Sequence, residues 1–338
     1  MTYHNQFPYV RLRRNRKSRA IRDLVQEHHI SSKDFIYPIF IVEGNNRKEE
    51  LQALPGQYRY SIDRLPEVID LCLSLGISAI GLFPSIEDSK YRDDYATESY
   101  NPEGLIQRAI MQVKAQYPQV LVCSDVALDP YTTSGHDGII DQQGYVINDV
   151  TNAVLIKQAL SHANCGADFV CPSDMMDGRI GLIRNSLEEL SFNNTGIIAY
   201  SAKYCSNLYA PFRKTVRPGC QPLAGDAKAN YFLNPANSME ALHEVELDLA
   251  EGADIVMVKP GLPYLDIVHQ IKQKFNKPTA VYQVSGEYAM FKVAAANDVL
   301  NYENMIMELM LCFKRAGADI IWSYSALDVA TILKQQSN

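Results

Sequence analysis

The sequence predicts an α/β fold, an eight-stranded parallel (β/α)8 TIM barrel preceded by an extended N-terminal arm. Three observations predict it: eight short apolar runs rich in β-branched residues, longer stretches of helical periodicity between them, and a tripeptide, Gly-Ala-Asp, before three of the runs. Runs that are apolar along their whole length are typical of strands buried on both faces, as in a parallel sheet.

The predicted strands follow one another from residue 35 nearly to the C-terminus. They span residues 35–43, 79–85, 120–128, 168–174, 196–203, 254–260, 279–286 and 319–326. Gly166, Gly252 and Gly317 open the three tripeptides, where glycine ends a helix in the left-handed conformation. The sequence has no G-x-G-x-x-G or G-x-x-x-x-G-K-[ST] motif. Eight strands without a phosphate loop favour a closed barrel over an open doubly wound sheet.

Composition and charge limit the classes of partner. The chain has 338 residues, 47% hydrophobic and 21% charged, with a formal net charge of -7. This balance gives no general attraction to nucleic acid or anionic membranes, so an anionic ligand must be held by local cations. The seven cysteines form no C-x-x-C pair and indicate reduced thiols. No apolar run is long enough to span a bilayer, and no secretory signal is recognisable. We therefore expect a cytoplasmic protein with no membrane or nucleic-acid partner.

The segment 11–22, RLRRNRKSRAIR, carries seven cations and contrasts with the acidic remainder. A solvated face, a nucleic-acid-binding segment and an arm that docks on a neighbouring subunit are the three interpretations. No aromatic interleaving or binding module accompanies the run, which disfavours nucleic acid. We assign residues 1–33 to an N-terminal arm for subunit contacts and residues 34–338 to the barrel.

Polar residues collect at the C-terminal ends of the predicted strands, where barrels of this class build their active sites. They are Asp125, Ser173, Asp174, Lys203, Lys259, Ser285 and Tyr324. Two lysines end adjacent strands, although lysine is rarely placed in an apolar strand without a partner or a chemical role. Desolvation and a neighbouring cation both lower the pKa of a lysine and make its amine nucleophilic. The pair therefore indicates Schiff-base chemistry; the alternative is two lysines that pair with carboxylates at the barrel rim.

Five long motifs, in order, resemble one enzyme family. They are SDVALDPYTTSGHDG (124–138), PSDMMDGR (172–179), YSAKYCSNLYAPFR (200–213), MVKPGLPYLD (257–266) and YQVSGEYAM (282–290). These motifs are similar to those of porphobilinogen synthase, also called 5-aminolevulinate dehydratase. The resemblance implies a TIM barrel and a hydro-lyase of heme biosynthesis. Such an enzyme condenses two 5-aminolevulinate molecules to porphobilinogen with loss of two waters.

The resemblance also implies roles for individual residues. Lys259 would form the Schiff base with the substrate that supplies the propionate side chain, and Lys203 with the one that supplies the acetate side chain. Ser285 and Tyr324 look like the hydroxyl donors to the propionate-side carboxylate. Arg213 matches the guanidinium that binds the acetate-side carboxylate.

The neighbour of this arginine, Phe212, resembles an aromatic residue that packs over the substrate from a lid at residues 207–226. Closure of the lid would exclude water from the imines. Asp125 is a candidate to orient the amines or relay protons, with Ser173 as its hydrogen-bond neighbour. Either residue could instead satisfy backbone groups at a strand end.

Residues 225–232, GDAKANYF, depart from the family pattern and look one residue longer. Lys228 matches the second acetate-side cation, and Phe232 stands where the family has a glutamine. Loss of that amide would weaken the grip on substrate unless Asn230 replaces it.

The resemblance carries a metal expectation. Zinc-dependent members have three cysteines after strand three, where this chain has Ala127, Asp129 and Asp137. Without soft thiolates we expect no catalytic zinc, and Asp129 and Asp137 favour magnesium or a monovalent ion if they bind any. Glu244 matches the residue that holds an allosteric Mg²⁺ in magnesium-stimulated members. An acid on a helix face is, without that resemblance, usually only solvated.

Together, the motifs and the resemblance predict a homo-oligomer, an octamer by resemblance, that uses no organic cofactor. One alternative is an aldolase with a single Schiff-base lysine, which would leave the second lysine and the second set of carboxylate binders unexplained. A non-catalytic alternative is an RNA-binding or scaffold protein that works through the arginine-rich arm.

Overall fold

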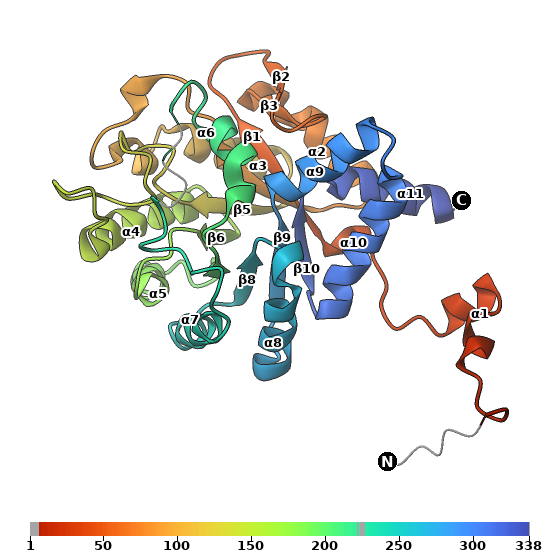
Figure 1. Ribbon diagram of the computed structural model, residues 1–338. Helices are drawn as coiled ribbons and strands as arrows, with labels where there is room; N and C mark the ends of the chain where they lie inside the picture. The colour runs from red at the N-terminus through yellow and green to blue at the C-terminus, as the bar shows by residue number, and fades with distance from the viewer. Residues whose placement is uncertain (1–6, 222, 224–226, 338) are drawn as a thin grey trace.

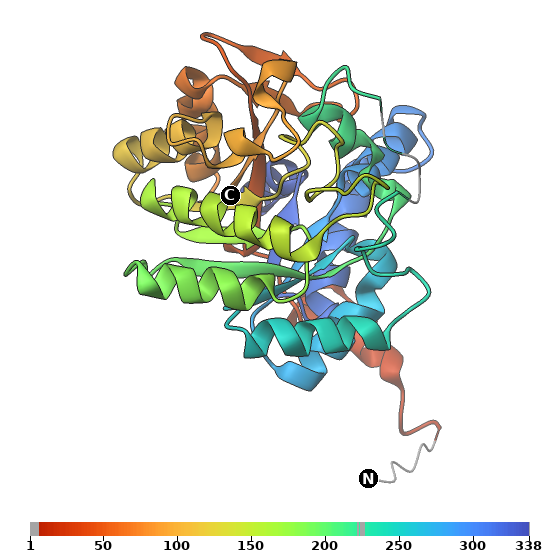
Figure 2. The same cartoon turned by 90° about the vertical axis from the view of Figure 1, so that its left-hand side faces the viewer.

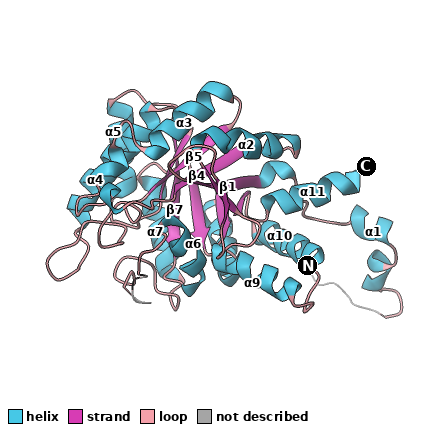
Figure 3. Cartoon of the chain, turned by 90° about the horizontal axis from the view of Figure 1, so that it is seen from above, coloured by secondary structure: helices cyan, strands magenta, loops and turns pink. Residues whose placement is uncertain are grey.

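The predicted (β/α)8 barrel is confirmed in the computed structural model, which describes residues 7–221, 223 and 227–337. Hydrogen bonding between the last strand and the first closes the sheet, and all eight barrel strands are parallel. Viewed from above, the strands lie in the centre with the helices around them (Figure 3). The barrel strands are β1 (Phe35–Ile41), β4 (Ala79–Pro84), β5 (Leu121–Val126), β6 (Phe169–Pro172), β7 (Gly196–Lys203), β8 (Ile255–Lys259), β9 (Thr279–Gln283) and β10 (Ile320–Ser323).

Each predicted run contains one barrel strand, and most runs extend too far at their C-terminal ends. Residues 284–286 were predicted as strand, but Ser285 is the first residue of a helix. Apolar residues that leave the sheet to begin a loop or helix are still buried, so hydrophobicity does not mark the strand end. Two short strands were not predicted: β3 (Tyr58–Tyr60) pairs in parallel with the end of β1, and β2 (Lys48–Glu50) pairs with β3 in the antiparallel direction.

Helices lie before, between and after the barrel strands, and all those described except α1, which belongs to the N-terminal arm, cover the barrel. The helices are α1 (Arg19–Leu24), α2 (Leu65–Ser74), α3 (Leu105–Gln116), α4 (Asn148–Asn164), α5 (Arg179–Glu189), α6 (Ala210–Val216), α7 (Met239–Ala250), α8 (Leu265–Phe275), α9 (Ser285–Ala296), α10 (Tyr302–Ala316) and α11 (Ala326–Ser337). Figure 2 shows α4, α5 and α7 stacked along one flank. Gly166, Gly252 and Gly317 have φ of +97°, +106° and +114°, so each Gly-Ala-Asp turns the chain through the left-handed region, as predicted.

Large aromatic side chains fill the barrel interior. The Trp322 ring lies 5.5 Å from that of Tyr282 and 6.1 Å from that of Phe83, centroid to centroid. A Cβ on Gly81 would lie 2.1 Å from the Trp322 ring, so only glycine lets the indole pack against β4. The closely packed interior holds the strand ends, and the side chains on them, in fixed positions.

The N-terminal arm stands away from the barrel (Figure 1). None of residues 7–34 is buried, and Phe35 is the first buried side chain. Leu12 and Leu24 are 73% and 84% exposed. The arm therefore has no core of its own, and its predicted role in subunit contacts is taken up below. Among the described residues, no helix combines the length and apolar character that a membrane crossing requires.

Candidate active site

Two lysines lie side by side at one end of the barrel. Lys203 is the last residue of β7 and Lys259 the last of β8, and the strand register pairs them directly. Each is buried, with 6% of its surface exposed. They share a pocket with Asp125, Ser173, Asp129, Asp137, Arg213, Lys228, Phe212, Phe232 and Tyr209. The structure thus gathers most of the predicted site residues at the C-terminal ends of the strands.

Lys259 has an aromatic environment. Its Nζ lies 4.4 Å from the Tyr282 ring centroid, 4.8 Å from that of Tyr200 and 5.3 Å from that of Phe212. Burial and then the positive charge of Lys203 lower the pKa of Lys259 to about 7. A large fraction of this amine is therefore neutral near neutral pH, as a nucleophile requires.

Lys203 has a polar environment instead. Its Nζ donates a hydrogen bond to the carbonyl oxygen of Ser173 and lies 3.3 Å from the Asp137 carboxylate. The Phe232 ring centroid is 4.1 Å away, close enough for a cation–π contact. Phe232, at the position where the resemblance predicts a glutamine, thus packs on Lys203. The two lysines are neighbours with different surroundings, which suits them to different steps.

Lys228 is held by two carboxylates. Its Nζ lies 3.4 Å from Asp129 and forms a closer ion pair with Asp137. Burial acts to raise the pKa of Asp137, but the charges of Lys203 and Lys228 outweigh it and keep that pKa below its ordinary value. The hydroxyl of Tyr231 also donates to Asp137. The loop after β5 therefore anchors Lys203 and Lys228.

These contacts bear on the metal expectation. A metal ion on the Asp129 and Asp137 oxygens would have to displace the Lys228 ammonium, so the pair fits an ion-pair anchor better than a metal centre. Ala127 has no ligand atom, and the buried thiol of Cys123 is engaged with that of Cys171. Within the described residues, no group of three or more His, Cys, Asp or Glu side chains is arranged to hold a metal ion. The donor set does not fit a thiolate-bound zinc.

Asp125 is positioned near both lysines but is bonded to neither. It lies in β5, and burial raises its pKa to about 7 against the opposing charge of Lys259. The Ser173 hydroxyl hydrogen-bonds to it, while its Oδ1 has no hydrogen-bond partner among the described residues. A buried carboxyl with a free oxygen and a pKa near neutrality is suited to accept and return protons.

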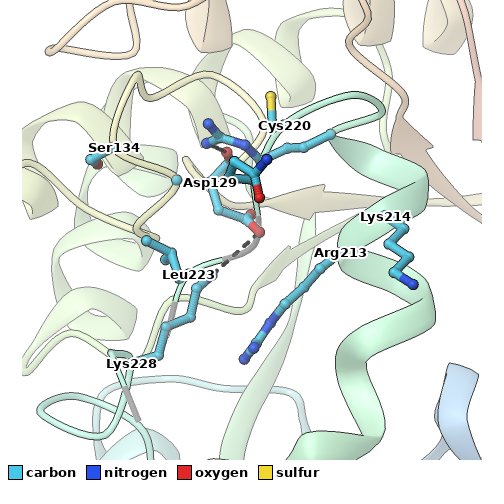
Figure 4. Close-up of a pocket in the computed structure, with 10 residues that line it drawn as sticks. Asp129, Ser134, Arg213, Lys214, Cys220, Leu223 and Lys228 are labelled. Atoms are coloured by element: carbon cyan, nitrogen blue, oxygen red, sulfur yellow. Dashed lines mark hydrogen bonds and ion pairs between the residues drawn. The ribbon is translucent and has the colours of Figure 1, made fainter. Parts of the chain in front are cut away.

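Arg213 projects from α6 into a pocket next to the lysines. Figure 4 shows its guanidinium reaching toward the space that Lys228 and Asp129 border from the opposite side. It lies over the Tyr209 ring, 5.9 Å from the centroid. Among the described residues it has no hydrogen-bonded or ion-paired partner. A guanidinium without a protein partner, beside Lys228, offers a site for a carboxylate.

Ser285 and Tyr324 line neither the pocket of Lys203 and Lys259 nor the neighbouring pocket of Arg213. The Ser285 hydroxyl accepts a hydrogen bond from the Phe212 N–H (3.0 Å) and donates to the Leu208 carbonyl (3.2 Å). Tyr324 accepts a hydrogen bond from the Tyr282 hydroxyl (3.3 Å). In this arrangement the beginning of α6 packs on Ser285, one of the two predicted propionate-side donors. The predicted lid, 207–226, includes residues 222 and 224–226, which lie outside the described residues.

Three site residues were not singled out from the sequence. Tyr209 donates a hydrogen bond to the backbone carbonyl of Lys259 (3.1 Å), and Tyr200 contributes to the aromatic environment of that lysine. Tyr231 joins His136 (3.2 Å) to Asp137. A tyrosine in a strand or loop is usually core, so no local signal distinguishes these three.

Glu244 lies on α7, the helix before β8, and is half-buried. Burial raises its pKa to about 7, and the carboxylates of Asp248 and Asp177 add to the effect. Glu244, Glu240, Asp177 and Asn148 line a cavity of about 230 Å³. The oxygen donors fit a hydrated Mg²⁺, which keeps several waters and needs only one or two direct carboxylate contacts.

Comparison with known proteins identifies one family. The family described as delta-aminolevulinic acid dehydratase matches residues 9–332. The delta-aminolevulinic acid dehydratase of Bradyrhizobium diazoefficiens is 46% identical over 327 residues, with 97% of this chain and 92% of the relative covered. That of Chlamydia pneumoniae is 47% identical over 325 residues, with 96% of each chain covered.

A solved structure is similarly close. The Toxoplasma gondii delta-aminolevulinic acid dehydratase, in complex with the reaction product porphobilinogen, superposes with a TM-score of 0.92 at 45% identity. The match covers 96% of this chain and 91% of that chain.

Proposed function

Because the chain belongs to the delta-aminolevulinic acid dehydratase family and has its lyase activity, we propose that Lys259 and Lys203 form the two imines of the reaction. Two molecules of 5-aminolevulinate are condensed to porphobilinogen with loss of two waters. The observation that carries the assignment is the pairing of two buried lysines, in register, on adjacent strands. Family membership decides against the single-lysine aldolase, which would leave the second amine without a role.

The two imines differ in how their amines become reactive. Lys259 already has a pKa near neutrality, so its neutral amine attacks the ketone of the propionate-side substrate, and the imine forms with loss of water. Lys203 is ion-paired with Asp137, and this pair has to open before the amine can attack a ketone. Asp125, with its free oxygen, is placed to take protons from the reacting groups and return them.

The substrate carboxylates require separate binding sites. Arg213 and Lys228 border one pocket and would bind the acetate-side carboxylate. Ser285 and Tyr324 would donate hydrogen bonds to the propionate-side carboxylate. For this, the Ser285 hydroxyl has to exchange its bond to the Leu208 carbonyl for one to the substrate. Phe212, bonded through its N–H to Ser285, then packs over the substrate and excludes water.

The direct test of this function is product formation. Purified protein incubated with 5-aminolevulinate should generate a pyrrole that Ehrlich reagent detects. The rate should depend on substrate at more than one site, because two molecules bind. Absence of a pyrrole from a folded, oligomeric preparation would exclude the proposed activity.

We further propose that Mg²⁺ stimulates the enzyme through Glu244 and that catalysis proceeds without zinc. Millimolar Mg²⁺ should raise turnover by about fivefold or more, the lower range of typical allosteric coupling. Glu244→Ala should lose this stimulation and keep basal turnover. The exposed Glu246, on the same helix, is the matched control, and Glu246→Ala should respond as the parent does.

Salt controls separate binding from screening of net charge. If added NaCl or Ca²⁺ at equal ionic strength reproduces the stimulation, no specific magnesium site exists. Tightly held stoichiometric zinc, whose removal abolishes activity and whose return alone restores it, would contradict the zinc-free assignment.

We also propose a cytoplasmic homo-octamer assembled through the N-terminal arm, with no nucleic-acid or membrane partner. Among the described residues of the arm none is fully buried, and only Ile30, close to the barrel, packs partly on the core, so we propose that the rest of the arm is ordered by docking on another surface. Deletion of residues 1–22 should leave a folded barrel with a smaller sedimentation coefficient and much lower activity. An unchanged, fully active oligomer would refute this role. A salt-sensitive gel shift with RNA, lost on the same deletion, would support the RNA-binding alternative.

A further inference from the structure

Arg217, at the C-terminal end of α6, makes an unusual set of contacts. Its Nη1 donates hydrogen bonds to the carbonyl oxygens of Asp129 (2.7 Å) and Thr132 (2.8 Å), and its Nη2 to that of Thr133 (3.2 Å). All three acceptors belong to the loop after β5. One side chain on the helix that carries Phe212 and Arg213 therefore binds the backbone of the loop that carries Asp129 and Asp137.

The loop after β5 packs closely around this guanidinium at Gly135. Gly135 has φ of +80°, and a Cβ there would lie 2.8 Å from Nη1 of Arg217. Any other residue would be strained and would push against the arginine. On the helix side, the carbonyls of Thr215 and Val216 accept hydrogen bonds from the Ser85 hydroxyl (2.7 Å) and the Ile86 N–H (3.0 Å). The C-terminal end of α6 is thus hydrogen-bonded to the barrel, and the side chain of Arg217 links the loop after β5 to this fixed end.

The loop in turn orients the acetate-side amines. Asp129, whose carbonyl accepts from Arg217, holds Lys228 with its carboxylate. Asp137, two residues after Gly135, holds both Lys228 and Lys203. Lys259 has no hydrogen bond or ion pair to this loop: its close contacts are to aromatic rings on other strands and on α6, and Asp129 and Asp137 act on it only through their charge. Displacement of the loop would therefore affect one half of the site and spare the other.

We infer that Arg217 is a positioning residue that fixes the loop after β5 and thereby aligns Lys203 and Lys228 with the acetate-side substrate. This inference rests on the proposed roles of Lys203 and Lys259. The planar guanidinium is required because three carbonyls are bound by two of its nitrogens, a geometry that a lysine ammonium cannot reproduce. A misplacement of about 1 Å in such a site can cost on the order of a hundredfold in rate.

The test uses the full-length oligomer and the variants Arg217→Met and Arg217→Lys. Both should raise the KM for 5-aminolevulinate and lower turnover by about tenfold or more. Borohydride trapping of substrate on Lys259 should stay within about twofold of the parent. Arg315→Met, which removes an exposed arginine on α10, is the matched control and should leave both measurements unchanged. The loop keeps its bonds to Asp93, so we expect the thermal midpoint to stay close to that of the parent.

Three other results would overturn the inference, and a fourth would contradict the proposed function. Parent-like kinetics in Arg217→Met would overturn the inference, and so would full recovery in Arg217→Lys, which would show that charge alone matters. A parallel loss of turnover and of Lys259 trapping would also overturn it, because it would indicate general damage to the site. Failure of the parent itself to trap substrate on Lys259 would instead contradict the proposed function.

Discussion

Lys259→Ala is expected to abolish porphobilinogen formation. The variant loses the covalent attachment point of the propionate-side substrate, and with it the reaction path, whereas loss of a single binding contact would only weaken the reaction. Among the described residues, the amines of Lys203 and Lys228 share the pocket, but both are ion-paired with Asp137, so neither is placed to substitute for the Lys259 amine among the rings of Tyr200, Tyr282 and Phe212.

Reductive trapping with borohydride tests directly whether the substrate is attached to Lys259. Borohydride added with 5-aminolevulinate should inactivate the parent enzyme and add the substrate mass to the peptide containing Lys259. The same treatment should leave Lys259→Ala unlabelled at that peptide. Lys274→Ala, which removes an exposed lysine paired with Glu246, is the control and should be labelled and active. Labelling of the parent only at other lysines would refute the assignment.

The pH dependence of this labelling follows from the lowered pKa. Only the neutral amine attacks, and burial with the charge of Lys203 brings the pKa of Lys259 to about 7. The rate of trapping should therefore rise as pH increases through about 7 and level off above it. A rate that continued to rise up to the ordinary lysine range would show that the amine is not buried in this way.

Lys203→Met carries the second largest expected effect. Turnover should fall by roughly a thousandfold or more, because the acetate-side imine is lost while methionine fills most of the lysine volume. Trapping on Lys259 should persist, since the propionate-side amine keeps its aromatic surroundings. Removal of the Lys203 charge also removes one cause of the lowered pKa of Lys259. The pH midpoint of trapping should therefore move upward in this variant.

Two measurements decide whether Lys203 forms an essential imine and whether its charge lowers the pKa of Lys259. Turnover and the pH profile of Lys259 trapping are compared with those of the parent, and Lys272→Met, at a surface ion pair, serves as the control. Nearly unchanged turnover would mean that Lys203 forms no essential imine. An unchanged midpoint would mean that burial alone sets the reactivity of Lys259.

The sequence by itself determined the barrel and the location of its active site. Strand burial on both faces appears as unbroken apolar runs, and the Gly-Ala-Asp turns mark where strands begin, so both are local signals. The positions of Lys203 and Lys259 at strand ends then follow from barrel geometry, because parallel strands end at the same face. The five motifs added the reaction that these residues serve.

Only the tertiary structure decided how each side chain is surrounded. Lys228 and Asp137 are 91 positions apart in the sequence, yet they form an ion pair in the pocket that holds Lys203 and Lys259. Three further contacts likewise depend on segments brought together by loops. They are the aromatic rings around Lys259, the hydrogen bond from the Phe212 N–H to Ser285, and the bonds of Arg217 to the loop after β5. Loop paths carry no periodic pattern, and partner choice between distant polar groups depends on distance and burial. For that reason the sequence predicted the two lysines and most of the residues around them but not Tyr200, Tyr209 or Tyr231, and the folded chain alone determined what each of them contacts.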